Sequence, residues 1–368
     1  MADIGIFTII ALDNYGAVLQ GYALQRQLDK LGASSELVDL RSREQNDCRI
    51  IKKIHSPTDI LRNIRQLSKY KKLKKRMDAF KRFVDKNMTL GINYPDAQAL
   101  VKKPLPYKML LTGSDQTFNI KLPVFKKEYY LYFEHKLPKA SYASSFGEFC
   151  GSYTAADREM IKKWLSEYKY IGIREEQGVS FAKEITGRDD IVKNADPTLL
   201  LERAEWDKLA TLGQADTSGD YILFYSVLSD NWVVERVKEI SKKLGMRVIA
   251  CHLCNKFEIG SGFERVYAGP EDFLKLVKNA RFVLTTSFHA TVFSLVFHKP
   301  FCSFVLEEGN RIRSLLEAAG LSDRAETEND KKDISFEIDF SEADKRLEKE
   351  RKDSIDYLKM VLRELPQP

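Results

Sequence analysis

The feature that most constrains the fold is a repeated alternation of short apolar runs with helical patterns. The chain begins with the β-type run DIGIFTII at residues 3–10, and a helical pattern, AVLQGYALQRQLDKLG, follows and closes at Gly32. A second β-type run occupies Glu36–Leu40. Strand, helix and strand at this spacing predict a parallel βαβ unit, the beginning of a doubly wound sheet.

The alternation continues through the chain and starts afresh near Asp196. In the first half we expect further strands at Lys108–Ser114, Lys139–Gly147 and Lys169–Glu175. In the second half we expect strands at Tyr221–Leu228, Met246–Leu253, Arg281–Phe288 and Phe301–Val305, and helices at Trp232–Leu244, Pro270–Asn279 and His289–Phe297. The pattern therefore predicts two αβ series, and the carboxyl ends of their strands should border a ligand-binding cleft.

These two series predict the domain organisation. A chain of 368 residues exceeds what one compact core usually accommodates. We expect an N-terminal Rossmann-like domain at 1–195 and a C-terminal Rossmann-like domain at 196–340. A charged amphipathic pattern over Glu342–Leu365 predicts a last helix. The segment 341–368 that carries it is expected to pack back on the first domain.

Composition and cysteine usage narrow the class of protein. The chain is 43% hydrophobic and 30% charged, as in ordinary folded proteins, and it has no apolar run of the length of about 20 residues that crosses a bilayer. Its N-terminus lacks the features of a secretion signal. The five cysteines are an odd number, and the lone Cys251–Cys254 pair has no second ligand pair for zinc. We expect a cytoplasmic protein without a disulfide framework, metal or cofactor.

Positive charge concentrates in KYKKLKKRMDAFKRFVDK, residues 69–86, where apolar residues recur at helical spacing. This pattern predicts a basic amphipathic helix. It is compatible with a solvated helix face and with contact to anionic lipid headgroups or an acidic acceptor. The net charge of +6 is too small to argue for nucleic-acid binding.

One cluster of candidate site residues lies in TTSFHA, residues 285–290. Ser287 is a good N-cap after an apolar strand, so the following helix should begin with free N–H groups that favour a phosphate or carboxylate. Phe288 and His289 stand at this helix start. An imidazole can give or take a proton near neutral pH.

Arginines supply a second set of candidates. Arg174 closes the apolar strand YIGIRE, where its planar fork could meet a phosphate or carboxylate, or form a salt bridge with Glu175, Glu176 or Asp196. Arg311 and Arg313 follow the last strand and are expected near the same cleft.

Two turns of the first half offer small and polar residues. Asn14 and Tyr15 precede the first helix, and Asp115 and Gln116 follow a strand. Neither G-x-G-x-x-G nor G-x-x-x-x-G-K-[ST], the loops of dinucleotide and triphosphate enzymes, is present. Asp196-Pro197-Thr198 is interpreted as shaping the interdomain turn.

Several segments together resemble the polysaccharide pyruvyl transferase family. They are NYGAVLQGYALQ (14–25), LLTGSDQTFN (110–119), ASYASSFG (140–147), IGIREEQG (171–178), ADPTLLL (195–201) and TTSFHATVFSLVFHKPF (285–301). These segments occur in order over most of the region from Ile4 to Leu321. Two positions depart from the family pattern: Ala290 stands where glycine is frequent, and Phe118 stands where tryptophan is frequent.

The resemblance implies an α/β fold of two facing Rossmann-like domains of the glycosyltransferase-B type, with a C-terminal helix. It implies transfer of the enolpyruvyl group of phosphoenolpyruvate to two hydroxyls of a sugar, which forms a cyclic ketal and releases phosphate. His289 would be the main catalytic residue, with Asp115 as a second base. The expected donor-binding residues are Arg174, Ser287, Phe288, His289, Arg311 and Arg313, and the expected acceptor-binding residues are Asn14, Tyr15, Gln20, Asp115 and Gln116.

Two alternatives remain at this point. A nucleotide-sugar-dependent glycosyltransferase would have a similar architecture, and a non-catalytic binding protein could keep the fold. The resemblance implies as partners phosphoenolpyruvate and a saccharide of a cell-surface polysaccharide, either free or carried on a membrane lipid. In the second case the enzyme would work at the inner face of the plasma membrane, with the Lys69–Lys86 helix as its contact.

Overall fold

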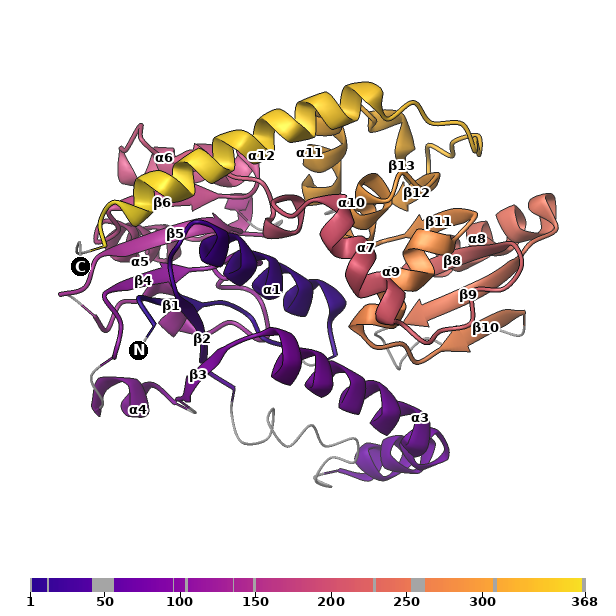
Figure 1. Cartoon of the computed structure of the whole chain (residues 1–368), viewed down its shortest axis with the longest axis horizontal. Helices are drawn as coiled ribbons and strands as arrows, with labels where there is room; N and C mark the ends of the chain where they lie inside the picture. Colours follow the sequence, from indigo (N-terminus) through magenta and orange to yellow (C-terminus); the bar gives the residue numbers. More distant parts are fainter. Residues whose placement is uncertain are drawn as a thin grey trace.

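The computed structural model consists of two lobes, each built around a parallel sheet and joined by long helices (Figure 1). The residues described are 2–11, 13–41, 56–94, 96–102, 105–134, 136–147, 150–227, 230–252, 262–306 and 310–365. Two of the five cysteines, Cys48 and Cys254, lie outside the described residues.

The first lobe contains a seven-stranded sheet in the order β3-β2-β1-β4-β5-β6-β7. All neighbouring strands in it are parallel. The strands are β1 (Ile4–Phe7), β2 (Ser35–Asp39), β3 (Leu90–Asn93), β4 (Met109–Thr112), β5 (Lys139–Ser144), β6 (Tyr170–Ile173) and β7 (Val192–Lys193). The order reverses at β1 and β4, which makes this the switch point where ligands bind in doubly wound sheets.

The second lobe contains a six-stranded sheet in the order β10-β9-β8-β11-β12-β13, also parallel throughout. The strands are β8 (Tyr221–Ser226), β9 (Arg247–His252), β10 (Phe263–Val266), β11 (Phe282–Thr285), β12 (Phe301–Phe304) and β13 (Ala325–Glu326). The predicted class, α/β with two parallel sheets and a C-terminal helix, is confirmed.

The helices cover both sheets and the junction between the lobes. They are α1 (Tyr15–Lys30), α3 (Pro57–Asn87), α4 (Ala97–Lys102), α5 (Ala155–Leu165), α6 (Glu176–Thr186), α7 (Arg203–Leu212), α8 (Asn231–Leu244), α9 (Pro270–Asn279), α10 (Phe288–Val296), α11 (Asn310–Ala319) and α12 (Ser341–Leu362). The structure adds α4, α6, α7 and α11 to the predicted elements, and also the edge strands β3, β7, β10 and β13. These strands have only two to four residues, too few to show a periodic pattern.

Helix α1 is buried along most of its length because it stands between the lobes. Its N-cap Asn14 accepts a hydrogen bond from the Ala17 N–H at 3.3 Å, which satisfies one free donor of the first turn. Gly32 follows the helix with φ of +83°, a left-handed conformation that glycine adopts without strain. The predicted glycine stop is therefore confirmed.

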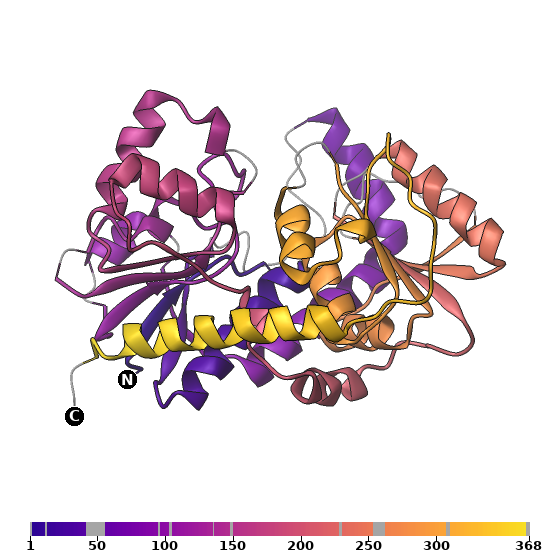
Figure 2. The same ribbon diagram turned by 90° about the horizontal axis from the view of Figure 1, so that it is seen from above.

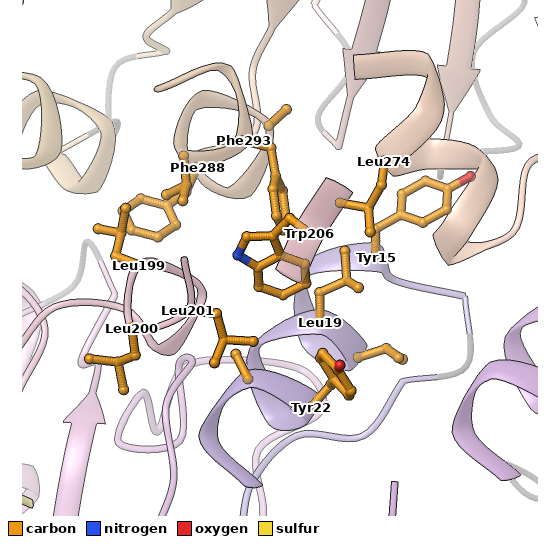
Figure 3. Packing of buried hydrophobic residues seen from close by; sticks show 14 of the residues in the cluster. Tyr15, Leu19, Tyr22, Leu199, Leu200, Leu201, Trp206, Leu274, Phe288 and Phe293 are labelled. Carbon is orange, nitrogen blue, oxygen red and sulfur yellow. The ribbon is translucent and has the colours of Figure 1, made fainter. Parts of the chain in front are cut away.

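Aromatic side chains fill one part of the junction between the lobes (Figure 3). The ring of Tyr15, from α1, stacks on Phe273 of α9 at 4.4 Å, and its hydroxyl donates to the Ala268 carbonyl at 2.9 Å. Trp206 of α7 lies edge-on to Tyr22 of α1 and to Phe293 of α10. These residues belong to one continuous apolar cluster that includes strands of both sheets.

Helix α12 runs along both lobes (Figure 2). Near its start Asp344 meets His298 of the second lobe at 2.9 Å. Toward its end the Tyr357 hydroxyl donates to the Ser141 carbonyl in β5, and Ser354 Oγ accepts from the Ala195 N–H. The helix therefore contacts the second lobe first and the first lobe afterwards, and the domain boundary at 195/196 stays a prediction.

Within the described part of the chain, no helix is both long and apolar enough to cross a membrane.

Candidate functional site

Polar side chains from both lobes meet where several strands end at their carboxyl edge. Asp115 follows β4, Arg174 and Glu175 follow β6, Asp196 follows β7, and His289 follows β11. All five are buried. Parallel strands present their carboxyl ends at one edge of a sheet, which is why segments distant in the sequence converge here.

Arg174 is the centre of this group, with 5% of its surface exposed. Its Nη1 donates to Asp196 Oδ2 at 2.9 Å, while Nη2 lies 4.0 Å from Asp115 Oδ1 and Nε lies 4.0 Å from Glu175 Oε2. Among the described residues, Nε and Nη2 have no hydrogen-bond partner. The guanidinium also stands over the Phe288 ring, 4.5 Å from its centroid. A buried arginine with two unused donors is suited to a bidentate anionic ligand.

Asp196 is buried and receives bonds at both oxygens. Oδ1 accepts from the Thr198 N–H and the Thr198 hydroxyl, and Oδ2 accepts from Arg174 and from the Ser114 hydroxyl at 3.2 Å. Burial by itself would raise the pKa of this carboxyl, but the charges of His289 and Arg174 together with the hydrogen bond from Thr198 hold the pKa well below its usual range. Asp196 is therefore ionised at neutral pH.

His289 is the second residue of α10 and is 8% exposed. Its Nε2 lies 3.5 Å from Asp196 Oδ2, and it has no hydrogen-bond partner in the described structure. On its other side the ring reaches the first lobe at Gly16, where an added Cβ would stand 2.0 Å from Nδ1. The imidazole thus lies between a carboxylate and the first turn of α1.

Glu175 differs electrostatically from Asp196, although both are buried beside Arg174. Burial raises the pKa of Glu175, against the lowering effect of the Arg174 charge and of the hydrogen bond that its Oε1 accepts from the Phe146 N–H at 2.8 Å. One carboxyl of the cluster is thus stabilised as the anion and the other is biased toward the protonated form. Such divergence between neighbouring carboxyls is typical of functional sites.

Asp115 is held in an unusual backbone conformation, with φ of +76°. Its carbonyl accepts from the Ser145 N–H at 2.9 Å and its Oδ1 accepts from the Gln116 N–H. The neighbouring strand β5 has a register shift between Ser141 and Ser144, with Ala143 at φ of +48°. Irregularities of this kind re-aim side chains and recur next to active sites.

A cavity opens beside Arg174. It is lined by Arg174, Glu175, Asp196, Phe288 and Arg311, with Lys193, Leu199, Ser314, Leu315 and Glu350 completing its wall. Two of the predicted donor-binding arginines thus face one space. Ser287, His289 and Arg313 are not part of this wall, and Arg313 is exposed on α11.

Two of the predicted acceptor-binding residues are buried and take structural contacts. Tyr15 is 1% exposed and packs in the aromatic junction, where burial raises its pKa well above the usual value. Gln20 is 0% exposed, and its Nε2 donates to Thr8 Oγ1 and to the Ala17 carbonyl. The role of Tyr15 and Gln20 in acceptor binding stays a prediction.

The other predicted residues keep access or take structural contacts. Asn14 and Gln116 are half-buried, and the Gln116 Oε1 accepts from Asn119 Nδ2 at 2.8 Å. Ser287 caps α10 as predicted, because its Oγ accepts from the Ala290 N–H at 3.4 Å. Phe118, one departure from the family pattern, stacks on Tyr130 in the core of the first lobe.

Asp196 has a larger part in the site than the sequence interpretation gave it. It was assigned to the interdomain turn, and it does cap the 3₁₀ turn Pro197–Leu199. Its second oxygen forms the salt bridge with Arg174 that the sequence offered as one alternative. The same oxygen also lies beside His289, 93 positions further along the chain, and no local pattern reveals this second contact. The sequence signal that could have indicated a site role is the position of Asp196 shortly after β7, at the carboxyl edge of the sheet.

Possible metal ligands and free thiols were also located among the described residues. Within the described residues, no three His, Cys, Asp or Glu side chains are grouped so that they could hold a metal ion. Cys251 and Cys302 are buried thiols, and burial raises the pKa of Cys251 to about 12.

The two-lobed arrangement places the protein in a known class of enzyme folds. It is similar to the UDP-N-acetylglucosamine 2-epimerase of Rickettsia bellii, with a TM-score of 0.51, 11% identity and coverage of 99% of this chain and 96% of that one. It is equally similar to the UDP-GlcNAc 2-epimerase of Neisseria meningitidis bound to UDP-GlcNAc, with a TM-score of 0.50, 12% identity and coverage of 99% of both chains. At this identity the likeness establishes the fold alone, which is glycosyltransferase-B-like.

The sequence then narrows the class to a family. The model of the family described as "Polysaccharide pyruvyl transferase" matches residues 14–307, which include every residue of the buried polar cluster. The chain therefore belongs to the polysaccharide pyruvyl transferase family. No curated protein sequence matches it.

Proposed function

We propose that this enzyme transfers the pyruvyl group of phosphoenolpyruvate to two hydroxyls of one sugar and forms a cyclic ketal. The observation that carries the proposal is Arg174, a buried arginine with two unused donors, close to His289 across Asp196. Phosphoenolpyruvate carries a carboxylate and a phosphate, both of which suit a guanidinium fork. The family membership supports the reaction class.

The reaction balances without a further reagent. The central carbon of phosphoenolpyruvate forms bonds to two sugar oxygens and loses its bond to the phosphate oxygen. Of the two protons that leave the hydroxyls, one ends on the methylene carbon, which becomes a methyl group, and the other leaves with hydrogen phosphate. The enzyme must therefore move protons and stabilise a departing anion.

The cluster offers a residue for each task. His289 would carry protons between hydroxyl, carbon and phosphate, a role that typically contributes about 10²- to 10⁴-fold in rate. Arg174, with Arg311 on the cavity wall, would hold the donor's negative charges. Asp115, Asn14 and Gln116 of the first lobe would face the sugar, and Asp115 is proposed as the second base.

The test is phosphate release from phosphoenolpyruvate with galactose-, mannose- and glucose-type acceptors. We expect release that depends on an acceptor and falls about 10²- to 10⁴-fold in His289→Ala. The matched control is His298→Ala, because this exposed histidine follows the C-terminal end of α10 and pairs with Asp344 of α12. It should leave turnover unchanged.

Thermal protection by ligands distinguishes pyruvyl transfer from the alternative function, a nucleotide-sugar-dependent glycosyltransferase. Phosphoenolpyruvate should raise the melting temperature, and a nucleotide sugar should not. Protection by a nucleotide sugar alone, with no phosphate release from any acceptor, would replace the proposal with a glycosyltransferase. Protection by neither ligand would favour a binding protein.

We further propose that the acceptor is a precursor carried on a membrane lipid and that α3 docks the enzyme on the cytoplasmic face of the membrane. The inner face of this helix, with Leu73, Phe80, Phe83 and Val84, is buried against the protein. These apolar residues, predicted from the sequence as one side of an amphipathic helix, therefore pack on the core.

A different stripe of α3 faces outward. Ile64 and Leu67 are each 57% exposed, and Ile60 and Tyr70 are exposed as well. Lys71, Lys72, Lys74 and Lys75 follow them, all exposed. Apolar residues at helical spacing beside a group of lysines are typical of helices that lie at an anionic lipid surface.

Vesicle sedimentation tests this docking. Vesicles with anionic phospholipid should bind the enzyme, and neutral vesicles should bind it weakly. Replacing the four lysines 71, 72, 74 and 75 with glutamine should reduce binding and turnover on a lipid-linked acceptor while sparing a free sugar. The control removes four exposed lysines from the other lobe, Lys208, Lys238, Lys242 and Lys243. Equal losses in both variants would show that only overall charge matters.

A further inference from the structure

We propose that Asp196 is a positioning residue that holds His289 with Nε2 toward its carboxylate, so that Nδ1, at Gly16, is the nitrogen that exchanges the substrate proton. The inference rests on the proposed function, since it assigns the atom that carries out the proton transfer. It also makes a statement about the resting enzyme that can be measured without any substrate.

Asp196 is fixed well enough to orient another group. Its Oδ1 is held by both polar groups of Thr198, at 3.0 Å to the N–H and 2.6 Å to the hydroxyl. Its Oδ2 is held by Arg174 Nη1 and by the Ser114 hydroxyl. The carboxylate is thus tied to β4, β6 and the turn Pro197–Leu199, and it can move little when His289 interacts with it.

The His289 side of the contact is incomplete. Nε2 is buried, lies 3.5 Å from Asp196 Oδ2, and has no hydrogen-bond partner within the described residues. A buried polar atom without a partner is unfavourable and calls for an explanation. Catalytic hydrogen bonds are often long before substrate binds and shorten in the complex. An Nε2–H that points at Asp196 in the resting enzyme, and whose bond shortens when the donor binds, accounts for the unpaired nitrogen.

Gly16 supplies the complementary observation on the other nitrogen. A Cβ at this position would stand 2.0 Å from His289 Nδ1 and 2.5 Å from two ring carbons, so any side chain here would displace the imidazole. Gly16 lies in the first turn of α1 and has no positive φ, so its backbone does not require glycine. Glycine is required instead because the imidazole occupies the space that a side chain would need. This contact brings Nδ1 to the first-lobe turn at Asn14, on the side proposed to face the sugar.

The two nitrogens therefore differ in their surroundings. Nε2 faces an anion that would accept its proton in a hydrogen bond, and Nδ1 faces the first lobe. A carboxylate beside one nitrogen fixes the tautomer, which leaves the other nitrogen free to accept a proton from a hydroxyl and pass it on. Arg174 shares Asp196 Oδ2 with His289, so the same carboxylate positions the donor-binding group and the proton carrier.

The experiment measures the tautomer directly by ¹⁵N NMR of histidine-labelled enzyme, with His289→Gln assigning the signals. The wild type should show Nε2 protonated and Nδ1 bare in the neutral imidazole. In Asp196→Asn this preference should be lost. Turnover should fall about 10²- to 10⁴-fold with a smaller change in KM for phosphoenolpyruvate. Retention of the melting transition excludes a simple loss of fold.

A second variant keeps the proposal falsifiable if Asp196→Asn folds poorly. Gly16→Ala should displace the ring and reduce kcat. Gly21→Ala on the same helix should not, because its Cβ would meet the flexible end of Met88 at 3.1 Å instead. Both substitutions favour the helix, so stability should not fall for reasons of propensity.

The outcomes separate the inference from the proposed function. An unchanged tautomer in Asp196→Asn, or equal turnover in Gly16→Ala and Gly21→Ala, would overturn the role of Asp196 and Gly16 while leaving the pyruvyl transfer intact. Lack of any phosphate release, with the wild-type tautomer as expected and lost in Asp196→Asn, would instead reject the reaction and keep the contact.

Discussion

The junction between the lobes has two halves, one of aromatic side chains and one of charged side chains. In one half Tyr15, Phe273, Trp206 and Phe293 pack their rings together, and one hydroxyl bond, from Tyr15 to the Ala268 carbonyl, joins the lobes there. In the other half a buried arginine is surrounded by three carboxyl groups and a histidine. The side chains of both halves are buried, so burial by itself does not distinguish them.

The difference lies in what burial does to each group. Removing aromatic rings from water lowers the free energy of the folded protein, and the aromatic half therefore holds the lobes together. Charges lose hydration, and buried ion pairs often stabilise a protein less than apolar residues of the same size would. A cluster with two unused donors on Arg174 and an unpaired Nε2 on His289 is a poor way to hold lobes together. The presence of this cluster is better explained by ligand binding.

The largest expected effect comes from breaking the polar half at Arg174. Arg174→Met leaves Asp115, Glu175 and Asp196 buried without their cation, so we expect a loss of about 3–5 kcal/mol in the free energy of unfolding. Turnover should fall about 10²- to 10³-fold or more, since the donor loses its electrostatic partner. Arg174→Lys keeps the charge without the fork and should recover stability more than turnover. Urea unfolding and phosphate release measure the two effects, and full activity in Arg174→Met would contradict the assignment.

The aromatic half is tested at Tyr15. Tyr15→Ala removes a ring that is stacked across the junction and should cost about 3–5 kcal/mol. Tyr15→Phe loses only the bond to the Ala268 carbonyl and should cost about 1 kcal/mol with turnover unchanged. Calorimetry and acceptor kinetics check both. An increase in acceptor KM in Tyr15→Phe without a loss of stability would restore the sugar-binding role that its burial argues against.

A smaller loss of stability is expected at Ser354, where α12 contacts the backbone beside the polar half. Ser354→Ala removes the acceptor of the Ala195 N–H, one residue before Asp196, and should cost about 1–2 kcal/mol because a buried donor is left unpaired. Ser180→Ala, at an exposed position of α6, is the matched control and should stay within about 0.5 kcal/mol of wild type. Equal stability of the two variants would mean that α12 contributes little to the position of Asp196.

The smallest effect concerns pH. Burial raises the pKa of Glu175, so the folded state binds its proton more tightly than the unfolded state does. The wild type should therefore lose stability as pH rises from about 4.3, the unfolded value, through the folded pKa. Glu175→Gln keeps the Oε1 acceptor for the Phe146 N–H and removes this loss, so the variant should gain on the wild type as pH rises. A difference in the free energy of unfolding between wild type and variant that stays constant across this pH window would contradict the prediction.

Much of the fold and part of the site could be predicted from the sequence because both depend on local pattern. The alternation of strands and helices identifies a doubly wound fold. Residues that follow strands, such as Arg174 and Ser287, can be placed at the carboxyl edge before any contact is known. The N-cap at Ser287 was predictable for the same reason, since it depends on three neighbouring residues. Short edge strands such as β3 and β7 were not, because a few residues carry no period.

What the sequence by itself determined is therefore the class of fold, its two sheets, the family, and which residues end their strands at one edge. Only the tertiary structure decided that Tyr15 is buried in the junction, since its hydroxyl bond to Ala268 spans 253 positions. Only the tertiary structure likewise brought Asp196 against both Arg174 and His289, and Gly16 against the imidazole. The physical reason is that hydrogen-bonding periods and caps act between near neighbours. Burial and charge pairing depend instead on which distant segments the packed lobes bring together.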